Sequence, residues 1–208
     1  MVKAVIFDID GVLVDSRRAN IELYKHILGR AGYRIPSDEE ILACFHLPLK
    51  QSIVKLAGVD EDKAEQLFAF AKAERPDMSQ FFTFPEKLRE VLESLHTKYK
   101  LAVVTGRIRI GIEEVFGKAE IGHLFDVAIA FEDYENPKPH PEPLLIALER
   151  LGVSADEAMY IGDSDTDIEA ARAANMRSIH LSRTPHPDAT AVISEFHELL
   201  EAIRSLTA

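Results

Sequence analysis

The segment Val5-Ile6-Phe7-Asp8-Ile9-Asp10-Gly11-Val12-Leu13-Val14-Asp15 decides the fold of this chain. An apolar run from Val2 to Phe7 gives way at once to two carboxylates and a glycine, which is the pattern of a buried strand with a polar end. Strand side chains alternate with period two, so Asp8 and Asp10 are expected on one side of the strand's end. Two carboxylates held so close repel each other unless a cation or a shared proton lies between them.

The bulk composition describes an ordinary globular protein. The 208 residues are enough for one core with a small accessory domain, and 47% apolar with 28% charged residues excludes a disordered or fibrous chain. The net charge of −11 disfavours a nucleic acid or an anionic membrane surface as a partner. A metal ion or a lysine inside a cleft can still attract a small anionic substrate.

The sequence also indicates the cellular compartment. Cys44 is the only cysteine, so an intrachain disulfide is excluded and a reducing compartment is compatible. No apolar run approaches the ~18 residues of a membrane span, and the first residues lack the pattern of a signal peptide. We therefore expect a cytoplasmic protein without a membrane or nucleic-acid partner, and the sequence leaves the oligomeric state open.

The region after Asp15 changes to a helical period. Apolar residues recur at helical spacing up to Gly32, Ser37 or Asp38 is typical of a helix start, and a further amphipathic piece spans roughly 60–74. No strand-like run occurs between residues 17 and 80. The sequence therefore predicts an all-helical block.

Helix and strand patterns alternate from residue 84 onward, which predicts a Rossmann-like α/β core with a parallel sheet and helices on both faces. The expected strands lie at 101–104, 127–130, 159–161, 178–181 and 191–193, and a last helix at 195–206. One short strand is not stable alone, so the first strand belongs to this sheet. We therefore expect an α/β core of residues 1–16 and 82–208, with an all-α cap domain of residues 17–81 inserted after the first strand and placed to open and close over a cleft.

Parallel α/β sheets bind ligands at the carboxyl ends of their strands. The polar residues expected there are Asp8, Asp10, Thr105, Gly106, Lys138, Asp163, Asp165 and Asp167. Carboxylates without a thiol or an imidazole suit Mg²⁺, whereas a hydroxyl, glycine N–H groups and a lysine suit a phosphoryl group. The pattern predicts phosphoryl transfer without a Walker loop, because the sequence contains no GxxxxGK[ST].

Four ordered segments carry a family resemblance. Asp8-Ile9-Asp10-Gly11-Val12, Val104-Thr105-Gly106, Lys138-Pro139, and Gly162-Asp163 with Asp167 resemble the motifs of the haloacid dehalogenase-like (HAD) hydrolases. The helical insert is similar to that of the subgroup with an α-helical cap, which includes phosphoglycolate phosphatase and β-phosphoglucomutase. The resemblance covers essentially the whole chain, and four motifs in order are far more specific than DxD alone.

The resemblance implies a two-step mechanism and a role for each residue. Asp8 is the expected nucleophile that forms an aspartyl-phosphate, and Asp10 the general acid and base. The Asp8 carboxylate, the backbone carbonyl of Asp10 and Asp163 would hold Mg²⁺.

The remaining motif residues have supporting roles. Thr105 and Gly106 would bind the phosphoryl group. Lys138 would offset the charge gathered at the site, and Asp167 would hold Lys138 or contribute to the metal site.

Several positions depart from the family pattern or keep an alternative open. Val12 stands where many members have threonine, and Gly106-Arg107 follows Thr105 where close relatives often have asparagine. Arg107 is a candidate either to bind phosphate or to pair with an acid. Asp165 is better explained as a first-turn helix acid than as a ligand. In the cap, His46 and Lys50 are candidates for the distal part of a substrate, as is Arg17.

These observations predict an Mg²⁺-dependent phosphatase that hydrolyses a small phosphorylated metabolite, with phosphoglycolate or a sugar phosphate as candidate substrates. One alternative is a phosphomutase of the β-phosphoglucomutase type, which returns the phosphoryl group to the sugar and needs a cap that excludes water. Another is a non-catalytic binding or regulatory member of the fold. The intact carboxylates disfavour that last alternative, because a buried charge cluster is costly to keep without a use.

Overall fold

The computed structural model describes residues 1–45, 47, 49–74, 76–184 and 186–207. These residues form two compact units. One consists of Met1–Asp15 with Thr83–Ala208, and the other of Ser16–Phe82. Asp15 and Thr83, where the chain leaves and re-enters the first unit, pair as an antiparallel bridge.

The first unit is built on a six-stranded sheet in the order β3-β2-β1-β4-β5-β6, and every neighbouring pair of strands is parallel. The strands are β1 (Ala4–Phe7), β2 (Lys100–Val104), β3 (Val127–Ile129), β4 (Ala158–Gly162), β5 (Arg177–Leu181) and β6 (Ala191–Ile193). β1 lies in the middle between β2 and β4. All four of its residues are buried, which explains why its sequence is continuously apolar.

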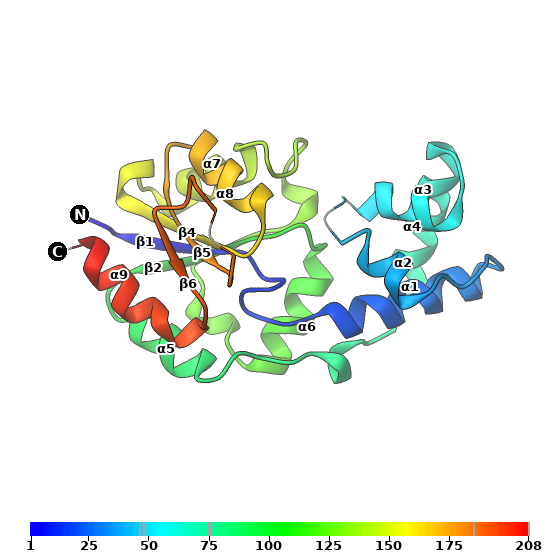
Figure 1. Ribbon diagram of the computed structural model, residues 1–208, viewed down its shortest axis with the longest axis horizontal. Coiled ribbons are helices and arrows are strands. Elements are labelled where there is room, and N and C mark those ends of the chain that lie inside the picture. The colour runs from blue at the N-terminus through cyan, green and yellow to red at the C-terminus, as the bar shows by residue number, and fades with distance from the viewer. Residues whose placement is uncertain (46, 48, 75, 185, 208) are drawn as a thin grey trace. The chain divides into compact units, whose positions relative to one another are not determined.

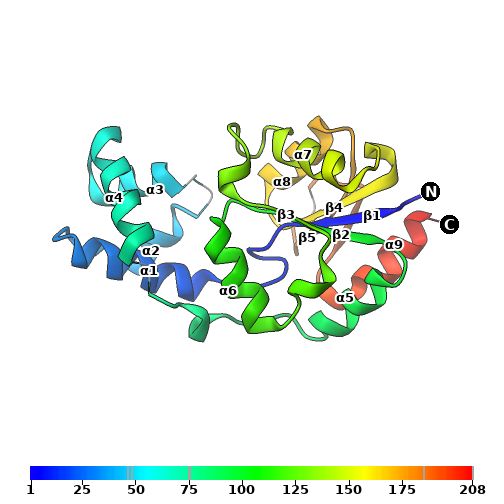
Figure 2. The ribbon, with the colours of Figure 1, turned by 180° about the vertical axis from the view of Figure 1, so that it is seen from behind.

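Helices cover both faces of this sheet. In Figures 1 and 2, α7 and α8 lie on one face, whereas α5 and α9 lie side by side on the other. The helices of this unit are α5 (Leu88–His96), α6 (Arg109–Ala119), α7 (Glu142–Leu151), α8 (Asp165–Ala173) and α9 (Leu199–Thr207). The predicted Rossmann-like α/β core with a parallel sheet is confirmed.

Successive residues of β1 pack on opposite faces of the sheet. Ile6 belongs to the core cluster that includes Tyr160 and residues of α7 and α8. Phe7 instead packs against Phe125 and Phe196, with ring centroids 6.2 and 6.4 Å away. This alternation fixes the register of β1, because a slip of one residue would exchange the two faces.

The described residues of the second unit form helices joined by loops, with no strand. Its helices are α1 (Arg17–Arg30), α2 (Asp38–Leu42), α3 (Leu49–Ala57) and α4 (Glu61–Glu74). Ser37 starts α2 as one of the two predicted caps, since its hydroxyl accepts the N–H of Glu40 while the Glu40 carboxylate accepts the N–H of Ser37. Cys44 is buried among Leu28, Ile41 and Leu56, as a small apolar residue would be.

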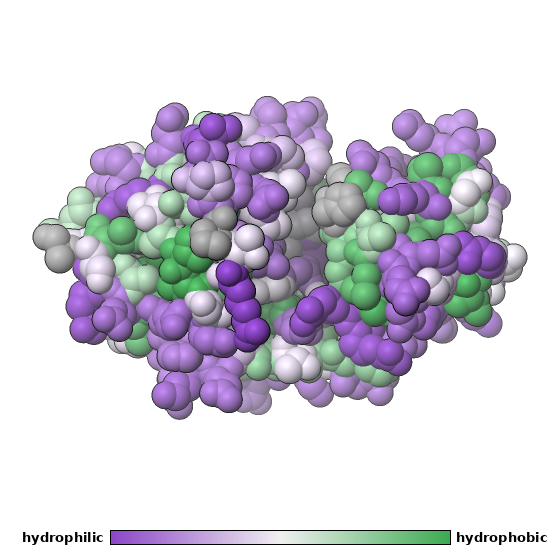
Figure 3. All heavy atoms as spheres, in the orientation of Figure 1, coloured by the Kyte–Doolittle hydropathy of each residue, from purple (hydrophilic) through white to green (hydrophobic). Residues whose placement is uncertain are grey.

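The surface seen in Figure 3 is mostly hydrophilic, in keeping with the 28% of charged residues. Among the described helices, none has both the length and the apolar character needed to cross a membrane.

Several element boundaries differ from the sequence expectation. The helix predicted from Glu195 begins as a single 3₁₀ turn at Phe196–Glu198, and α9 starts only at Leu199. β3 ends at Ile129, one residue before its predicted end, whereas β2, β4 and β5 each begin one residue earlier than predicted. None of these differences moves a candidate site residue.

Candidate active site

The candidate site lies where the strand order of the sheet reverses. β1 and β4 are neighbours in the sheet, and the chain continues outward from them in opposite directions. Asp8 follows β1 and donates its N–H to the carbonyl of Ile161, while Asp163 follows β4. Their carboxylates therefore come together at the topological switch point, the usual ligand site of such sheets.

Two glycines permit the close approach of the loops at this edge. Gly11 has φ +75°, and a Cβ at this position would lie 1.8 Å from Oδ2 of Asp163. A Cβ on Gly162 would lie 2.3 Å from the Cβ of Asp167. A side chain at either position would displace one of the acids, so steric restriction explains why both motif positions are glycine.

Lys138 lies between two carboxylates. Its Nζ lies 2.6 Å from Oδ1 of Asp167 and 3.1 Å from Oδ1 of Asp8, and only 12% of its side chain is exposed. Burial opposes the charged form, but the negative charges of Asp167 and Asp8 outweigh it and raise the pKa of Lys138 well above its usual value. The lysine is therefore a fixed positive charge beside Asp8.

Asp167 is saturated with hydrogen bonds. Its Oδ1 accepts from Lys138 and from the hydroxyl of Tyr160, and its Oδ2 accepts from the hydroxyl of Ser164 at 2.6 Å. Burial disfavours its charged form, yet Lys138 and these hydrogen bonds keep the pKa of Asp167 below its ordinary value. Of its two expected tasks, the geometry shows Asp167 holding Lys138.

Tyr160 and Ser164 support the site and were missed by sequence reasoning. The Tyr160 hydroxyl lies 2.9 Å from both Nζ of Lys138 and Oδ1 of Asp167. Ser164 caps α8 through the N–H of Asp167. The available signal was a tyrosine within the apolar strand before Gly162, since a buried hydroxyl needs a partner.

Asp8 carries an incomplete set of partners. It is 7% exposed, and no described donor makes a hydrogen bond to its buried Oδ1, because the contact from Lys138 lacks hydrogen-bond geometry. Burial raises the pKa of Asp8 to about 7, Lys138 opposes that rise, and the negative charges of Asp167 and Asp10 add to it. The carboxylate is therefore poised to take up a further positive charge.

Asp163 is a second carboxyl group with a raised pKa. Desolvation and the negative charges of Asp8 and Asp167 raise the pKa of Asp163 to about 8. Because the Asp163 side chain is exposed, the neighbouring negative charges contribute more to this rise in pKa than desolvation does. A bound cation would neutralise that repulsion directly.

This edge of the sheet fits a divalent cation. One carboxylate oxygen from each of Asp8, Asp163 and Asp167 lies within 4.8 Å of the others. Hard oxygen donors of this kind suit Mg²⁺. Since the oxygens of Asp167 already accept several hydrogen bonds, Asp8 and Asp163 are the better ligands.

Thr105 and Gly106 follow β2 at the same edge. Thr105 is buried, its hydroxyl accepts the N–H of Arg107 at 3.2 Å, and its carbonyl accepts the hydroxyl of Tyr134. The residue that precedes α6 as its cap is Ile108, so Thr105 does not have the capping role that threonine often takes. Gly106 is exposed, with nothing within 4 Å of where a Cβ would be.

Asp10 has a cationic partner of its own. Both of its carboxylate oxygens accept from Arg107, at 2.8 Å from Nε and 2.6 Å from Nη2. Of the two predicted roles for Arg107, the structure shows the pairing with an acid. The two motif carboxylates are thus each matched to a different cation, Asp8 to Lys138 and Asp10 to Arg107.

The other candidates have different surroundings. Asp165 is the first residue of α8 and is largely exposed, as a first-turn acid would be. Lys50 lies on α3 of the helical unit, where it pairs with Glu65, and Arg17 begins α1. His46 lies outside the described residues.

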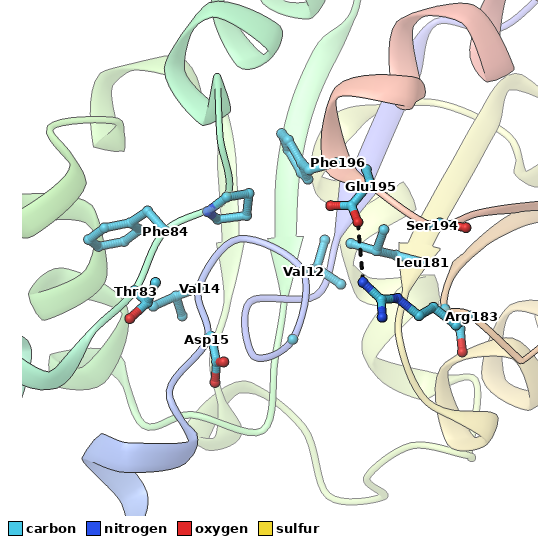
Figure 4. Close-up of a pocket in the computed structure, with 13 residues that line it drawn as sticks. Val12, Val14, Asp15, Thr83, Phe84, Leu181, Arg183, Ser194, Glu195 and Phe196 are labelled. Carbon is cyan, nitrogen blue, oxygen red and sulfur yellow. Dashed lines mark ion pairs between the residues drawn. The ribbon is translucent and has the colours of Figure 1, made fainter.

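A separate pocket of about 360 Å³ adjoins the loop that follows β1. It is lined mainly by apolar groups, and Figure 4 shows Val12, Leu181 and Phe196 around it, with the ion pair of Arg183 and Glu195 beside them. Asp8 and Asp163 do not line this pocket. The pocket therefore does not include the cluster of Asp8, Asp163 and Asp167.

Comparison with known families gives one match over most of the chain. Residues 5–181 match the model of the family described as "Haloacid dehalogenase-like hydrolase". This span includes all of the motif residues.

Three similar proteins extend this finding. Pyrophosphatase PpaX of Bacillus velezensis is 29% identical over 99% of this chain and 94% of its own. A crystal structure from Lactobacillus plantarum, of a protein provisionally named phosphoglycolate phosphatase, is 25% identical with a TM-score of 0.83, covering 97% of this chain and 99% of that one. The β-phosphoglucomutase of Clostridium difficile, at 19% identity, shares the fold with a TM-score of 0.82 over 99% of this chain and 96% of its own.

These matches confirm the family and the subgroup that the motifs indicated. The expected assignment as a phosphatase of this family agrees with relatives that are themselves named phosphatases.

Proposed function

Since the chain belongs to the haloacid dehalogenase-like hydrolase family, we propose that it is an Mg²⁺-dependent phosphatase that hydrolyses a small phosphorylated metabolite through an aspartyl-phosphate. The observation that carries the proposal is the state of Asp8, a buried carboxylate with an unsatisfied oxygen, an ammonium 3.1 Å away and Asp163 close by. The nucleophile must be ionised when it attacks an anionic phosphate, and the Lys138 ammonium opposes the rise in pKa that burial causes at Asp8.

Each residue at this edge has a task in the proposed reaction. An oxygen of Asp8 attacks phosphorus while Asp10 protonates the leaving oxygen, and Asp10 then takes a proton from the water that hydrolyses the aspartyl-phosphate. The hydroxyl of Thr105 and the N–H of Gly106 bind the phosphoryl oxygens. Lys138, itself held by Asp167 and Tyr160, offsets the charge at Asp8.

Mg²⁺ bound to Asp8, the backbone carbonyl of Asp10 and Asp163 would screen the nucleophile from the phosphate. The raised pKa values of Asp8 and Asp163 support this proposal, because a cation favours the ionised form of both carboxyls. Asp167 contributes by fixing Lys138 and not as a ligand.

We further propose that the helical unit of Ser16–Phe82 acts as a cap that selects the substrate. The names of the relatives add inorganic pyrophosphate to phosphoglycolate and sugar phosphates as candidate substrates. The single cysteine is compatible with a reducing compartment and supports a role in the cytoplasm.

The test is hydrolysis of p-nitrophenyl phosphate with and without Mg²⁺ by the wild type and by Asp8→Asn. We expect turnover that requires Mg²⁺ and disappears in the variant, and unchanged turnover in Asp8→Asn would sink the nucleophile assignment. A panel of phosphorylated metabolites then identifies the substrate. With a sugar 1-phosphate, release of inorganic phosphate indicates a phosphatase, whereas an isomerised sugar phosphate indicates a phosphomutase.

A further inference from the structure

Arg107 and Asp10 form an ion pair beside the proposed reaction centre in which both carboxylate oxygens accept hydrogen bonds. Two guanidinium nitrogens donate to the two oxygens of one carboxylate, at 2.8 and 2.6 Å. The Arg107 side chain is 9% exposed, while that of Asp10 is 36% exposed. A bidentate pair with a buried guanidinium is among the stronger polar contacts in proteins.

Arg107 is held in place by its own neighbours. Its N–H donates to the hydroxyl of Thr105, its carbonyl accepts the N–H of Phe131 at 2.8 Å, and its Nη1 lies 3.5 Å from the carbonyl of Gly111. Its guanidinium therefore comes from the loop that carries the proposed phosphoryl-binding residues. Guanidinium groups recognise phosphate oxygens with the same fork that they present to a carboxylate.

This contact restricts what Asp10 can do, on the premise that the proposed function is correct. A general acid must direct one oxygen, with its proton, at the leaving oxygen of the substrate. Both oxygens of Asp10 are instead occupied as acceptors of N–H groups of Arg107. A substrate that needs a proton from Asp10 must first separate this pair.

The requirement differs between two classes of phosphate substrate. When the P–O bond of a monoester of an uncharged alcohol breaks, the alcohol leaves as an alkoxide unless its oxygen receives a proton, so hydrolysis of the monoester depends on Asp10. The trianion of pyrophosphate, HP₂O₇³⁻, already carries the proton that its leaving half needs. When an Asp8 oxygen bonds to one phosphorus, the bridging P–O bond breaks with its electron pair on the bridging oxygen, and HPO₄²⁻ leaves.

We propose that Arg107 is a specificity-determining residue that makes this site favour phosphoanhydrides, such as inorganic pyrophosphate, over phosphate monoesters of uncharged alcohols. The second phosphate of a phosphoanhydride offers Arg107 an anionic partner in exchange for Asp10. An uncharged alcohol offers none, so its monoester bears the whole cost of separating the pair. The second step, hydrolysis of the aspartyl-phosphate, is common to both classes and needs Asp10 as the carboxylate that Arg107 holds.

The test compares kcat/KM for inorganic pyrophosphate with kcat/KM for ethyl phosphate, in the presence of Mg²⁺. The variants are Arg107→Gln and Arg107→Lys, and the control is Arg89→Gln, which removes an arginine that is 49% exposed and paired with Glu93 and Glu120. We expect the pyrophosphate-to-ethyl-phosphate ratio to fall by about tenfold or more in Arg107→Gln, to lie between wild type and that value in Arg107→Lys, and to stay constant in the control.

A structural role alone would lower both rates together and leave the ratio unchanged, and that result overturns the proposal. A second readout uses two inhibitors that cannot be hydrolysed, methylenediphosphonate and ethylphosphonate, which differ in the second anionic group. The inhibition constant of methylenediphosphonate divided by that of ethylphosphonate should rise in Arg107→Gln, because only the diphosphonate loses an anionic contact, and an unchanged ratio also contradicts the proposal.

The outcomes also separate this inference from the proposed function. Turnover that depends on Asp8 but shows the same ratio in all variants refutes the role of Arg107 alone. Absence of any turnover that depends on Asp8 refutes both. If Arg107→Gln does not fold, the ratio in Arg107→Lys decides the question, since it keeps the charge and loses the bidentate fork.

Discussion

The Lys138 ammonium lies 2.6 Å from Oδ1 of Asp167, a carboxylate whose side chain is only 1% exposed. This buried pair sets the position of the positive charge beside Asp8, and Tyr160 and Ser164 complete its hydrogen bonds. The catalytic edge of the sheet therefore rests on a contact between the loop before α7 and the first turn of α8.

Replacing Asp167 with alanine should destabilise the protein strongly. The substitution leaves Lys138 buried without its main partner, and breaking a buried pair from one side costs roughly 3–5 kcal/mol. The free energy of unfolding, measured by urea denaturation, should fall by that amount. Glu120→Gln, at the exposed pair with Arg89, should cost less than about 1 kcal/mol, and equal losses in the two variants would refute the role given to Asp167.

Replacing Tyr160 with phenylalanine should have an intermediate effect. It removes a hydroxyl that lies 2.9 Å from both Lys138 and Asp167 but leaves those two in contact, so we expect a loss of about 1–3 kcal/mol. Tyr134→Phe removes one hydrogen bond to the neutral carbonyl of Thr105 and should cost about 1 kcal/mol. A smaller loss in Tyr160→Phe than in Tyr134→Phe would argue against the support given to Lys138.

The Gly11→Ala substitution should disrupt the site through steric overlap and backbone strain. The new Cβ would lie 1.8 Å from Oδ2 of Asp163. The backbone at this position has a φ of +75°, which residues other than glycine rarely adopt. We expect loss of phosphatase activity and a lower melting temperature. Gly117→Ala in α6, where no atom lies within 4 Å of the new Cβ, should be neutral or stabilising by up to about 1 kcal/mol. Full activity in Gly11→Ala would show that the loop can move away from Asp163.

The stability of the metal-free protein should fall as pH rises from 5 to 8. Asp8 and Asp163 have folded pKa values of about 7 and about 8, above their ordinary value of 3.8, so in this window the folded state binds more protons than the unfolded state. Stability then decreases with increasing pH, because deprotonation favours the unfolded chain. Glu40 and Glu157, with pKa values lowered to about 2, titrate below this window and do not mask the effect.

Adding Mg²⁺ should reverse this trend, because a cation that binds the ionised carboxylates stabilises the folded state more as pH rises. Melting temperatures measured at pH 5 and 8, with and without Mg²⁺, check both statements. The Asp163→Asn variant should show a shallower pH dependence and a smaller effect of Mg²⁺. A rise in metal-free stability from pH 5 to 8 that Asp163→Asn leaves unchanged would contradict the assignment of these two acids.

The sequence by itself determined the fold and the set of groups at the strand ends. Short apolar runs that alternate with segments of helical period predicted the parallel sheet, because burial on both faces leaves β1 and β4 almost wholly apolar. Asp8, Thr105 and Asp163 could be placed at one edge before any contact was known, since the carboxyl ends of parallel strands meet there.

Only the tertiary structure decided which acidic side chain pairs with which basic side chain. Local patterns do not reveal that Asp167 would pair with Lys138, because the two residues are 29 positions apart in the sequence. Nor could they choose between phosphate and Asp10 for Arg107, which lies 97 residues further along the chain. Ion pairs form between side chains that the fold brings within a few ångströms, and that proximity depends on the packing of the whole sheet.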